Sequence, residues 1–182
     1  MKNKTLCLLF LLFSIPSLAD SITPINWGTG FYTATLNGTP IQMVCIDALR
    51  QGPPLGVTYE ATVSRFDDLS ATRRPDLALN YTAAAYLYDQ MLAHPDSAGQ
   101  IQSAMWSLLT PSVGITSPWA IQALSLAPTF NTSQFVVITP TGNASSQEMI
   151  ARLAPTAVPE PATLLLLGAG LAALSTRLKK KG

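Results

Sequence analysis

Few side chains in this sequence have types suited to covalent chemistry, and the first of them is the thiol of Cys45. The chain has two cysteines, and the other, Cys7, lies in the first 19 residues, a segment that we expect to be removed. Exported proteins normally pair their cysteines, so a single remaining thiol needs a reason. Cys45 is therefore either a small buried apolar residue or a reactive group.

A glutamine and a tryptophan at helical spacing form the second candidate. Residues 97–100 (Ser-Ala-Gly-Gln) have the pattern of a capping box, which predicts a helix over residues 97–109. Residues four apart on a helix lie side by side, so Gln102 and Trp106 are expected on one face.

A β-hairpin is expected to position Cys45. Residues 31–46 alternate as two strands around Asn-Gly at 37–38, the preferred dipeptide of a two-residue turn. This register places Cys45 on the apolar face of the hairpin, with only the hydrogen of Gly30 opposite the thiol. The pairs that it predicts are Leu36–Thr39, Ala34–Ile41, Tyr32–Met43 and Gly30–Cys45.

The rest of the pattern predicts an α+β domain. Residues 57–63 and 135–139 read as strands, residues 80–93 as a helix, and Ser117-Pro118 as the start of a third, shorter helix. We expect a small β-layer containing the hairpin, with a packed helical pair against it. An N-terminal signal helix and a C-terminal transmembrane helix complete the expected fold.

Two short segments, residues 44–47 (Val-Cys-Ile-Asp) and 101–106 (Ile-Gln-Ser-Ala-Met-Trp), resemble the thioester domains of bacterial surface adhesins. In that family a cysteine condenses with the glutamine of a Φ-Gln-x-x-Φ-Trp motif, where Φ is apolar. The resemblance implies an acyl sulfur on Cys45 and an acyl carbon on Gln102, with loss of ammonia and with Trp106 shielding the bond from water. A buried thioester is an activated acyl group that is protected from hydrolysis while a partner nucleophile can still be admitted.

Other reactive groups are weaker candidates. Gln122 also follows an isoleucine, but residue 126 is Leu where the motif has Trp. His94 is the only histidine and precedes a proline, and a Cys45–His94 pair is the alternative nucleophile. The acidic pair at 67–68 is more typical of a solvated turn than of a metal site. We expect no catalytic residue, no metal, no cofactor and no enzymatic turnover.

The middle of the chain is acidic and contains no lysine. Residues 20–158 carry five arginines and nine carboxylates, a net charge of −4, and all five lysines lie outside this range. Without a basic stripe, binding to nucleic acid is excluded as the expected function. A domain without lysine also lacks the internal amines most able to attack a thioester.

The N-terminus has the pattern of a signal peptide. Lys2 and Lys4 precede an apolar run over residues 6–13, and Ser-Leu-Ala at 17–19 forms a small-residue cleavage site. We expect a signal peptidase to cut after Ala19.

The C-terminus combines Pro159, Glu160 and Pro161 with an apolar segment over residues 162–176 and a basic end. As a helix these 15 residues would cover about 22 Å, short for the roughly 30 Å of hydrocarbon in a bilayer. The basic end is expected to stay in the cytoplasm. This order of parts resembles the PEP-CTERM sorting signals of Gram-negative bacteria that make extracellular polysaccharide. The resemblance implies recognition by a membrane transpeptidase of the exosortase type and removal of the tail.

The expected organisation is a signal peptide (1–19), a thioester-domain-like ectodomain (20–142), a linker (143–157) and a sorting tail with a transmembrane helix (158–182). After transient anchoring in the inner membrane, the protein is expected at the cell surface or in the extracellular matrix. Two functions stay open. One is a covalent adhesin whose thioester captures amine or hydroxyl groups of matrix or cell-surface polymers. The other is an inert structural component of the exopolysaccharide matrix with the same fold and no thioester.

Overall fold

The protein consists of six β-strands and three α-helices over the residues that the structure describes. The structure is a computed structural model, and it describes residues 19–28, 30–110, 112–142 and 146–153. The strands are β1 (Asp20–Gly28), β2 (Phe31–Leu36), β3 (Thr39–Cys45), β4 (Tyr59–Arg65), β5 (Phe135–Pro140) and β6 (Met149–Arg152). The helices are α1 (Ala78–Ala93), α2 (Ala98–Leu109) and α3 (Pro118–Leu126), with short 3₁₀ turns at Pro75–Leu77, Pro95–Ser97 and Ala127–Thr129.

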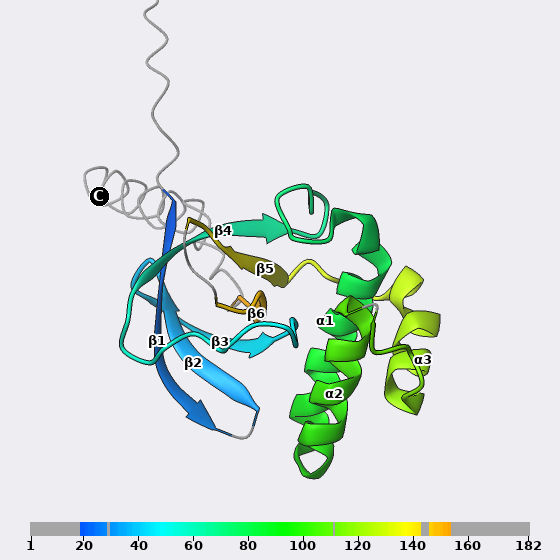
Figure 1. Cartoon of the computed structure of the whole chain (residues 1–182). Helices are drawn as coiled ribbons and strands as arrows, with labels where there is room; N and C mark the ends of the chain where they lie inside the picture. Colours follow the sequence, from blue (N-terminus) through cyan, green and yellow to red (C-terminus); the bar gives the residue numbers. More distant parts are fainter. Residues whose placement is uncertain (1–18, 29, 111, 143–145, 154–182) are drawn as a thin grey trace, which may run out of the picture.

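The strands close into a barrel, in the order β1-β2-β3-β6-β5-β4 (Figure 1). All six neighbouring pairs are antiparallel. The expected fold class, a small β-layer with a helical pair, is therefore wrong. Closure depends on β1 pairing with β4 and on β3 pairing with β6, and neither contact between distant segments leaves a periodic signal in the sequence.

The β2–β3 hairpin forms in the predicted register. Tyr32 pairs with Met43 and Leu36 pairs with Thr39. Asn37 and Gly38 both have positive φ, at 51° and 81°, which a two-residue turn of type I′ requires and which an Asn-Gly dipeptide tolerates. The predicted Gly30–Cys45 pair lies beyond Tyr32–Met43, the last pair of these two strands, and on its other edge Cys45 pairs with Met149 of β6.

The short strand β6 comes from the segment that the sequence assigned to a linker. Residues 149–152 lie between β3 and β5 and pair with both strands. All of them except Arg152 are buried. The folded unit therefore continues past residue 142, the expected end of the domain.

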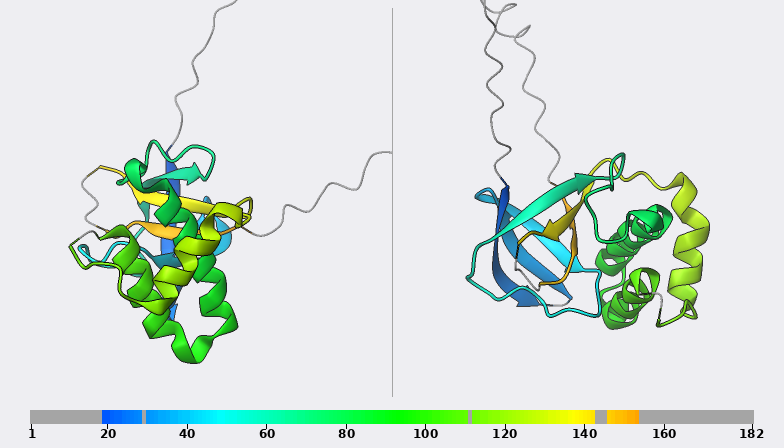
Figure 2. Two further views of the ribbon diagram at one scale, coloured as in Figure 1. Left: turned by 90° about the vertical axis from the view of Figure 1, so that its right-hand side faces the viewer. Right: turned by 45° about the horizontal axis from the view of Figure 1, so that its top comes forward.

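The three helices pack together on one side of the barrel, so the third helix predicted from Ser117-Pro118 is present and joins the expected pair. α1 contacts both α2 and α3, and α3 lies on the far side of the other two helices from the barrel (Figure 2). α2 begins at Ala98, close to the predicted start, but the Ser97 side chain makes no capping hydrogen bond. The 3₁₀ turn at Pro95–Ser97 leads into the helix instead.

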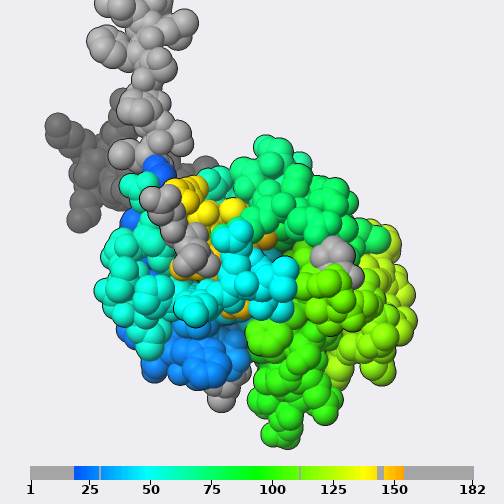
Figure 3. Space-filling model, in the orientation of Figure 1, coloured from blue at the N-terminus to red at the C-terminus, as the bar shows by residue number. Residues whose placement is uncertain are grey.

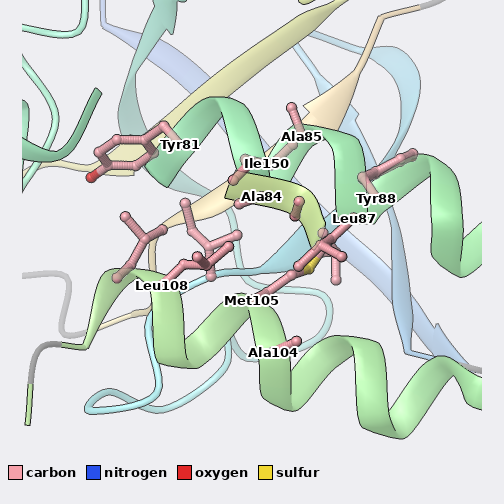
Figure 4. Close-up of a cluster of buried hydrophobic side chains, with 14 of the residues drawn as sticks. Tyr81, Ala84, Ala85, Leu87, Tyr88, Ala104, Met105, Leu108 and Ile150 are labelled. Atoms are coloured by element: carbon pink, nitrogen blue, oxygen red, sulfur yellow. The ribbon is translucent and has the colours of Figure 1, made fainter. Parts of the chain in front are cut away.

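Two apolar clusters stabilise this arrangement. The larger one lies between the helices and the barrel, where α1 and α2 side chains such as Leu87 and Met105 meet Ile150 of β6 (Figure 4). The smaller cluster takes alternate residues from every strand and fills the barrel interior. Its buried members are Ile22, Ala34, Ile41, Met43, Cys45, Ala61, Val136, Ile138, Met149 and Ala151.

Within the described part of the chain, no helix combines the length and the apolar character that crossing a membrane requires. The expected signal helix in residues 1–19 and the expected transmembrane helix over 162–176 fall outside the described residues, apart from Ala19.

Candidate functional site

A pocket of about 480 Å³ opens where the barrel meets α2. Its wall is formed by barrel strands, by α2, by the segment that follows β3 and by Gln147, which lies two residues before β6. The residues lining it are Trp27, Gly30, Tyr32, Cys45, Gly52, Ala98, Gly99, Gln102, Trp106 and Gln147. Among the described residues, this lining includes no acidic, basic or histidine side chain. The pocket is therefore neutral and rich in aromatic rings.

Cys45 is the last residue of β3, and its side chain belongs to the apolar cluster inside the barrel. The residue is 7% exposed. Burial raises the pKa of the thiol to about 12, the neighbouring Tyr32 hydroxyl opposes this, and the charge of Asp47 adds to the rise. At neutral pH the group is a protonated thiol.

Gln102 reaches Cys45 from α2. Its Nε2 atom donates a hydrogen bond of 2.5 Å to the backbone carbonyl oxygen of Cys45. Both residues line the same pocket. The two residues singled out from the sequence are therefore in contact, although different layers of the fold carry them.

Trp106 follows Gln102 by one helical turn and lines the same pocket. Its indole Nε1 atom is buried and has no hydrogen-bond partner among the described residues. An unpaired buried N–H is uncommon in folded proteins. The side chain forms part of the pocket wall, and its shielding of a thioester stays a prediction.

The polypeptide next to Cys45 is held by a network of polar side chains. Arg73 lies 2.9 Å from the Asp47 carboxylate and also donates to the backbone oxygen of Ser146 at 2.8 Å. The buried Glu148 carboxylate accepts hydrogen bonds from the Arg73 backbone N–H and from the Tyr81 hydroxyl. These contacts tie the end of β3 to the start of β6 and to α1.

A second, larger pocket of about 890 Å³ lies beside this network and is lined by residues that include Asp47, Arg50 and Glu148. The segment between β3 and β4, cyan in Figure 3, lies over the junction between the barrel and the helices. Residues of this segment line both pockets: Leu49 and Arg50 line the larger one, and Gly52 lines the one that contains Cys45.

Sequence reasoning missed two polar members of the Cys45 pocket. Tyr32 was placed on the same hairpin face as Cys45, but only as an apolar neighbour. Gln147 lay in the expected linker, and its side-chain amide donates to the backbone oxygen of Asp47. The hairpin register contained the signal for Tyr32, whereas nothing in the sequence pointed to Gln147.

The competing candidates lie elsewhere in the structure. Gln122 is exposed on α3 and does not line the Cys45 pocket. His94 is exposed and contacts Trp119, with ring centroids 5.5 Å apart. Asp68 accepts a hydrogen bond from the backbone N–H of Ser70, as expected for a solvated turn. In the described residues, no group of three or more His, Cys, Asp or Glu side chains is placed to hold a metal ion.

Comparison with protein families identifies the C-terminal end of the chain. Residues 157–181 match the model of the PEP-CTERM protein-sorting motif. The chain carries a PEP-CTERM tail. This tail contains Pro159, Glu160 and Pro161 and marks the chain as an exported protein that an exosortase processes. The comparisons with curated proteins and with solved structures give no match. The thioester-domain resemblance of the middle of the chain therefore depends on its own residues and contacts.

Proposed function

We propose that the exported domain is a covalent adhesin, in which the Cys45 sulfur and the Gln102 side-chain carbonyl carbon are joined as a thioester. The observation that carries this proposal is the hydrogen bond of 2.5 Å from Gln102 Nε2 to the Cys45 carbonyl oxygen, within a pocket that both residues line. Covalent closure needs the reacting residues to lie close together, and the hydrogen bond that joins α2 to the end of β3 supports this.

The proposed chemistry has two steps. In the first, the Cys45 sulfur attacks the Gln102 carboxamide carbon, the C–N bond breaks, and ammonia leaves with the thiol proton. In the second, an amine or hydroxyl of a partner attacks the same carbon, the C–S bond breaks, and the Cys45 thiol is restored. The partner stays attached to Gln102 through an amide or ester. This is one covalent event without turnover, so we do not propose an enzyme.

The surroundings of the two residues support a protected acyl group. Cys45 is buried, and Trp106 covers the pocket wall one helical turn beyond Gln102. A site that limits access of water slows hydrolysis. The absence of lysine from residues 20–158 removes the strongest internal competitors for the acyl carbon.

The PEP-CTERM tail supports export of the domain out of the cell, where it meets partners that it captures. We propose that a signal peptidase removes residues 1–19 and that an exosortase removes the tail. The domain then reaches the surface or the extracellular matrix of a Gram-negative cell. There its partners are matrix or cell-surface polymers that present amines or hydroxyls.

One contact favours the alternative, an inert component of the exopolysaccharide matrix. The Gln102 amide already has an ordinary structural partner in the Cys45 backbone oxygen. In this alternative Cys45 is simply a small apolar residue of the barrel interior. The protein would then act by bulk association with polysaccharide.

Methylamine labelling of the protein recovered from the producing cells tests the proposal. A thioester would transfer its acyl group to methylamine and leave an N-methylated side chain at Gln102, which peptide mass spectrometry locates. Gln122→Ala is the matched control and should label normally, while Cys45→Ala should not label at all. Absence of label at Gln102 in the wild-type protein would favour the inert alternative.

A further inference from the structure

Tyr32 is the second reactive side chain at the Cys45 sulfur. Its side chain packs against the apolar cluster that contains Cys45, both side chains line the same pocket, and its hydroxyl lowers the pKa of the thiol. The backbone of Gly52 lies against the Tyr32 hydroxyl, at a place where any side chain at position 52 would collide with that oxygen. The Tyr32 hydroxyl therefore occupies space that is free only because Gly52 has no side chain.

The proposed thioester chemistry requires a proton to move at this sulfur. When the C–S bond breaks, a thiolate in the buried position of Cys45 is strongly disfavoured. The entering amine or hydroxyl has to lose a proton in the same event. A group that both gives and takes a proton beside the sulfur would meet both needs.

We infer that Tyr32 relays a proton between the Cys45 sulfur and the nitrogen or oxygen at the Gln102 carbonyl carbon. This inference rests on the proposed function. During capture, Tyr32 gives its hydroxyl proton to the sulfur as the C–S bond breaks, and it takes a proton from the attacking amine or hydroxyl. During formation, Tyr32 takes the thiol proton and gives its own to the departing ammonia. In both directions the tyrosine ends as it began, and no other reactant is needed.

The other groups around the pocket are less suited to this task. The Trp106 indole N–H only donates hydrogen bonds, and the Gln147 amide is bonded to the backbone oxygen of Asp47. No carboxylate or histidine lines the pocket among the described residues. The pKa of Tyr32 is raised by burial and by Cys45, so its hydroxyl carries the proton at neutral pH.

Tyr59 provides a matched control. Its side chain packs against the apolar cluster that contains Cys45, and burial followed by the charges of Cys45 and Tyr32 raises its pKa. That hydroxyl is buried without a hydrogen-bond partner among the described residues, and Tyr59 does not line the pocket. Tyr59→Phe therefore removes a phenol near the site without removing a contact to the sulfur. Tyr32→Phe keeps the ring that packs against Trp27, with ring centroids 6.3 Å apart.

The first measurement is the rate at which methylamine opens the thioester in protein recovered from the producing cells. Tyr32→Phe should slow opening by about 100-fold or more, or prevent thioester formation in a folded protein, while Tyr59→Phe should match the wild type. If methylamine opened the thioester of the Tyr32→Phe protein at the wild-type rate, the proposed proton relay would be wrong. If the wild-type protein itself contains no thioester, the proposed function fails, and the wild-type sample thus separates the two failures.

The second measurement does not depend on the thioester. In a Gln102→Ala background the Cys45 thiol is free, and its alkylation rate follows its thiolate fraction. Adding Tyr32→Phe removes the hydroxyl that lowers the thiol pKa, so alkylation should slow roughly tenfold for each unit by which the pKa rises. Adding Tyr59→Phe should not slow it. Equal rates in all three proteins would contradict the contact between Tyr32 and the sulfur on which the relay depends.

Discussion

The side-chain amide of Gln102 lies 2.5 Å from the backbone carbonyl oxygen of Cys45, although 57 residues separate the two in the sequence. Cys45 ends a barrel strand and Gln102 lies on the second helix, so the contact joins the two layers of the fold. Chain segments that lie between them in the sequence, including β4 and α1, have to pack correctly before the two residues meet. The proposed chemistry therefore depends on the complete domain.

The ion pair of Arg73 with Asp47 should contribute to stability because both side chains are largely buried, at 20% and 18% exposed. Replacing Arg73 with Ala leaves Asp47 without its closest cation and also removes the bond to Ser146. We expect the free energy of unfolding in urea to fall by about 2 kcal/mol.

The neighbouring Arg74 is the control for this substitution. Its pair with Asp76 is exposed, and pairs of that kind contribute little to stability. Arg74→Ala should therefore unfold at the wild-type urea concentration. Equal effects of Arg73→Ala and Arg74→Ala would contradict the role given to the network beside Cys45.

Gly52 should be intolerant of a side chain. A Cβ atom at this position would collide with the Tyr32 hydroxyl, whereas a Cβ atom at Gly28 meets nothing within 4 Å. We expect Gly52→Ala to lower the free energy of unfolding by about 1–3 kcal/mol, since overpacking costs are of this order.

The same substitution should also move the Tyr32 hydroxyl away from Cys45, so methylamine opening should slow as it does in Tyr32→Phe. Gly28→Ala should change neither property. If Gly52→Ala resembled Gly28→Ala in both assays, the position assigned to the Tyr32 hydroxyl would be wrong.

The buried Cys45 thiol should make stability depend on alkaline pH in a variant that cannot form a thioester, such as Gln102→Ala. The pKa of the thiol is raised from 9.0 to about 12, so the folded state holds its proton over a range where the unfolded chain has lost it. This stabilisation is complete below pH 9 and decreases as the pH rises toward 12, by at most about 1.4 kcal/mol per pH unit.

Urea unfolding at a series of pH values measures this dependence. The matched variant is Gln102→Ala with Cys45→Ala, which should show a shallower decrease between pH 9 and 11. Identical slopes would show that the thiol ionises equally easily in the folded and unfolded states.

Local elements were predictable because short-range geometry determines them. The Asn-Gly dipeptide at 37–38 allowed the correct register of the β2–β3 hairpin, since that turn needs positive φ at both positions. The proline at position 95 ends α1 after Ala93, close to the predicted boundary. The placement of Cys45 on the inner face of its strand followed from the same register.

Barrel closure was not predictable from local patterns. The strand β6 has only four residues, too few for a clear alternation, and lies among polar residues that resemble a linker. The pairing of β1 with β4 joins segments about 40 residues apart, and only packing of the complete chain selects it. Gln147 and the Arg73 network were missed for the same reason, because each depends on contacts that closure creates.

The PEP-CTERM motif at residues 157–181 predicts a processed protein. Mass spectrometry of material from the cell surface should find an N-terminus near Asp20 and no peptide beyond Pro161. Replacing Pro159, Glu160 and Pro161 with Ala should leave the tail attached, because the sorting motif is then lost. Recovery of the wild-type chain from the surface with its tail intact would contradict processing.

The intact mass of the freshly purified processed protein tests the central proposal most directly. Thioester formation releases ammonia, so the wild-type mass should lie about 17 Da below the mass calculated for the processed chain. Cys45→Ala and Gln102→Ala should each show their calculated masses, while Gln122→Ala should keep the deficit. A wild-type protein at its full calculated mass, with a Cys45 thiol that alkylates while the domain is folded, would contradict the thioester and leave the inert matrix role.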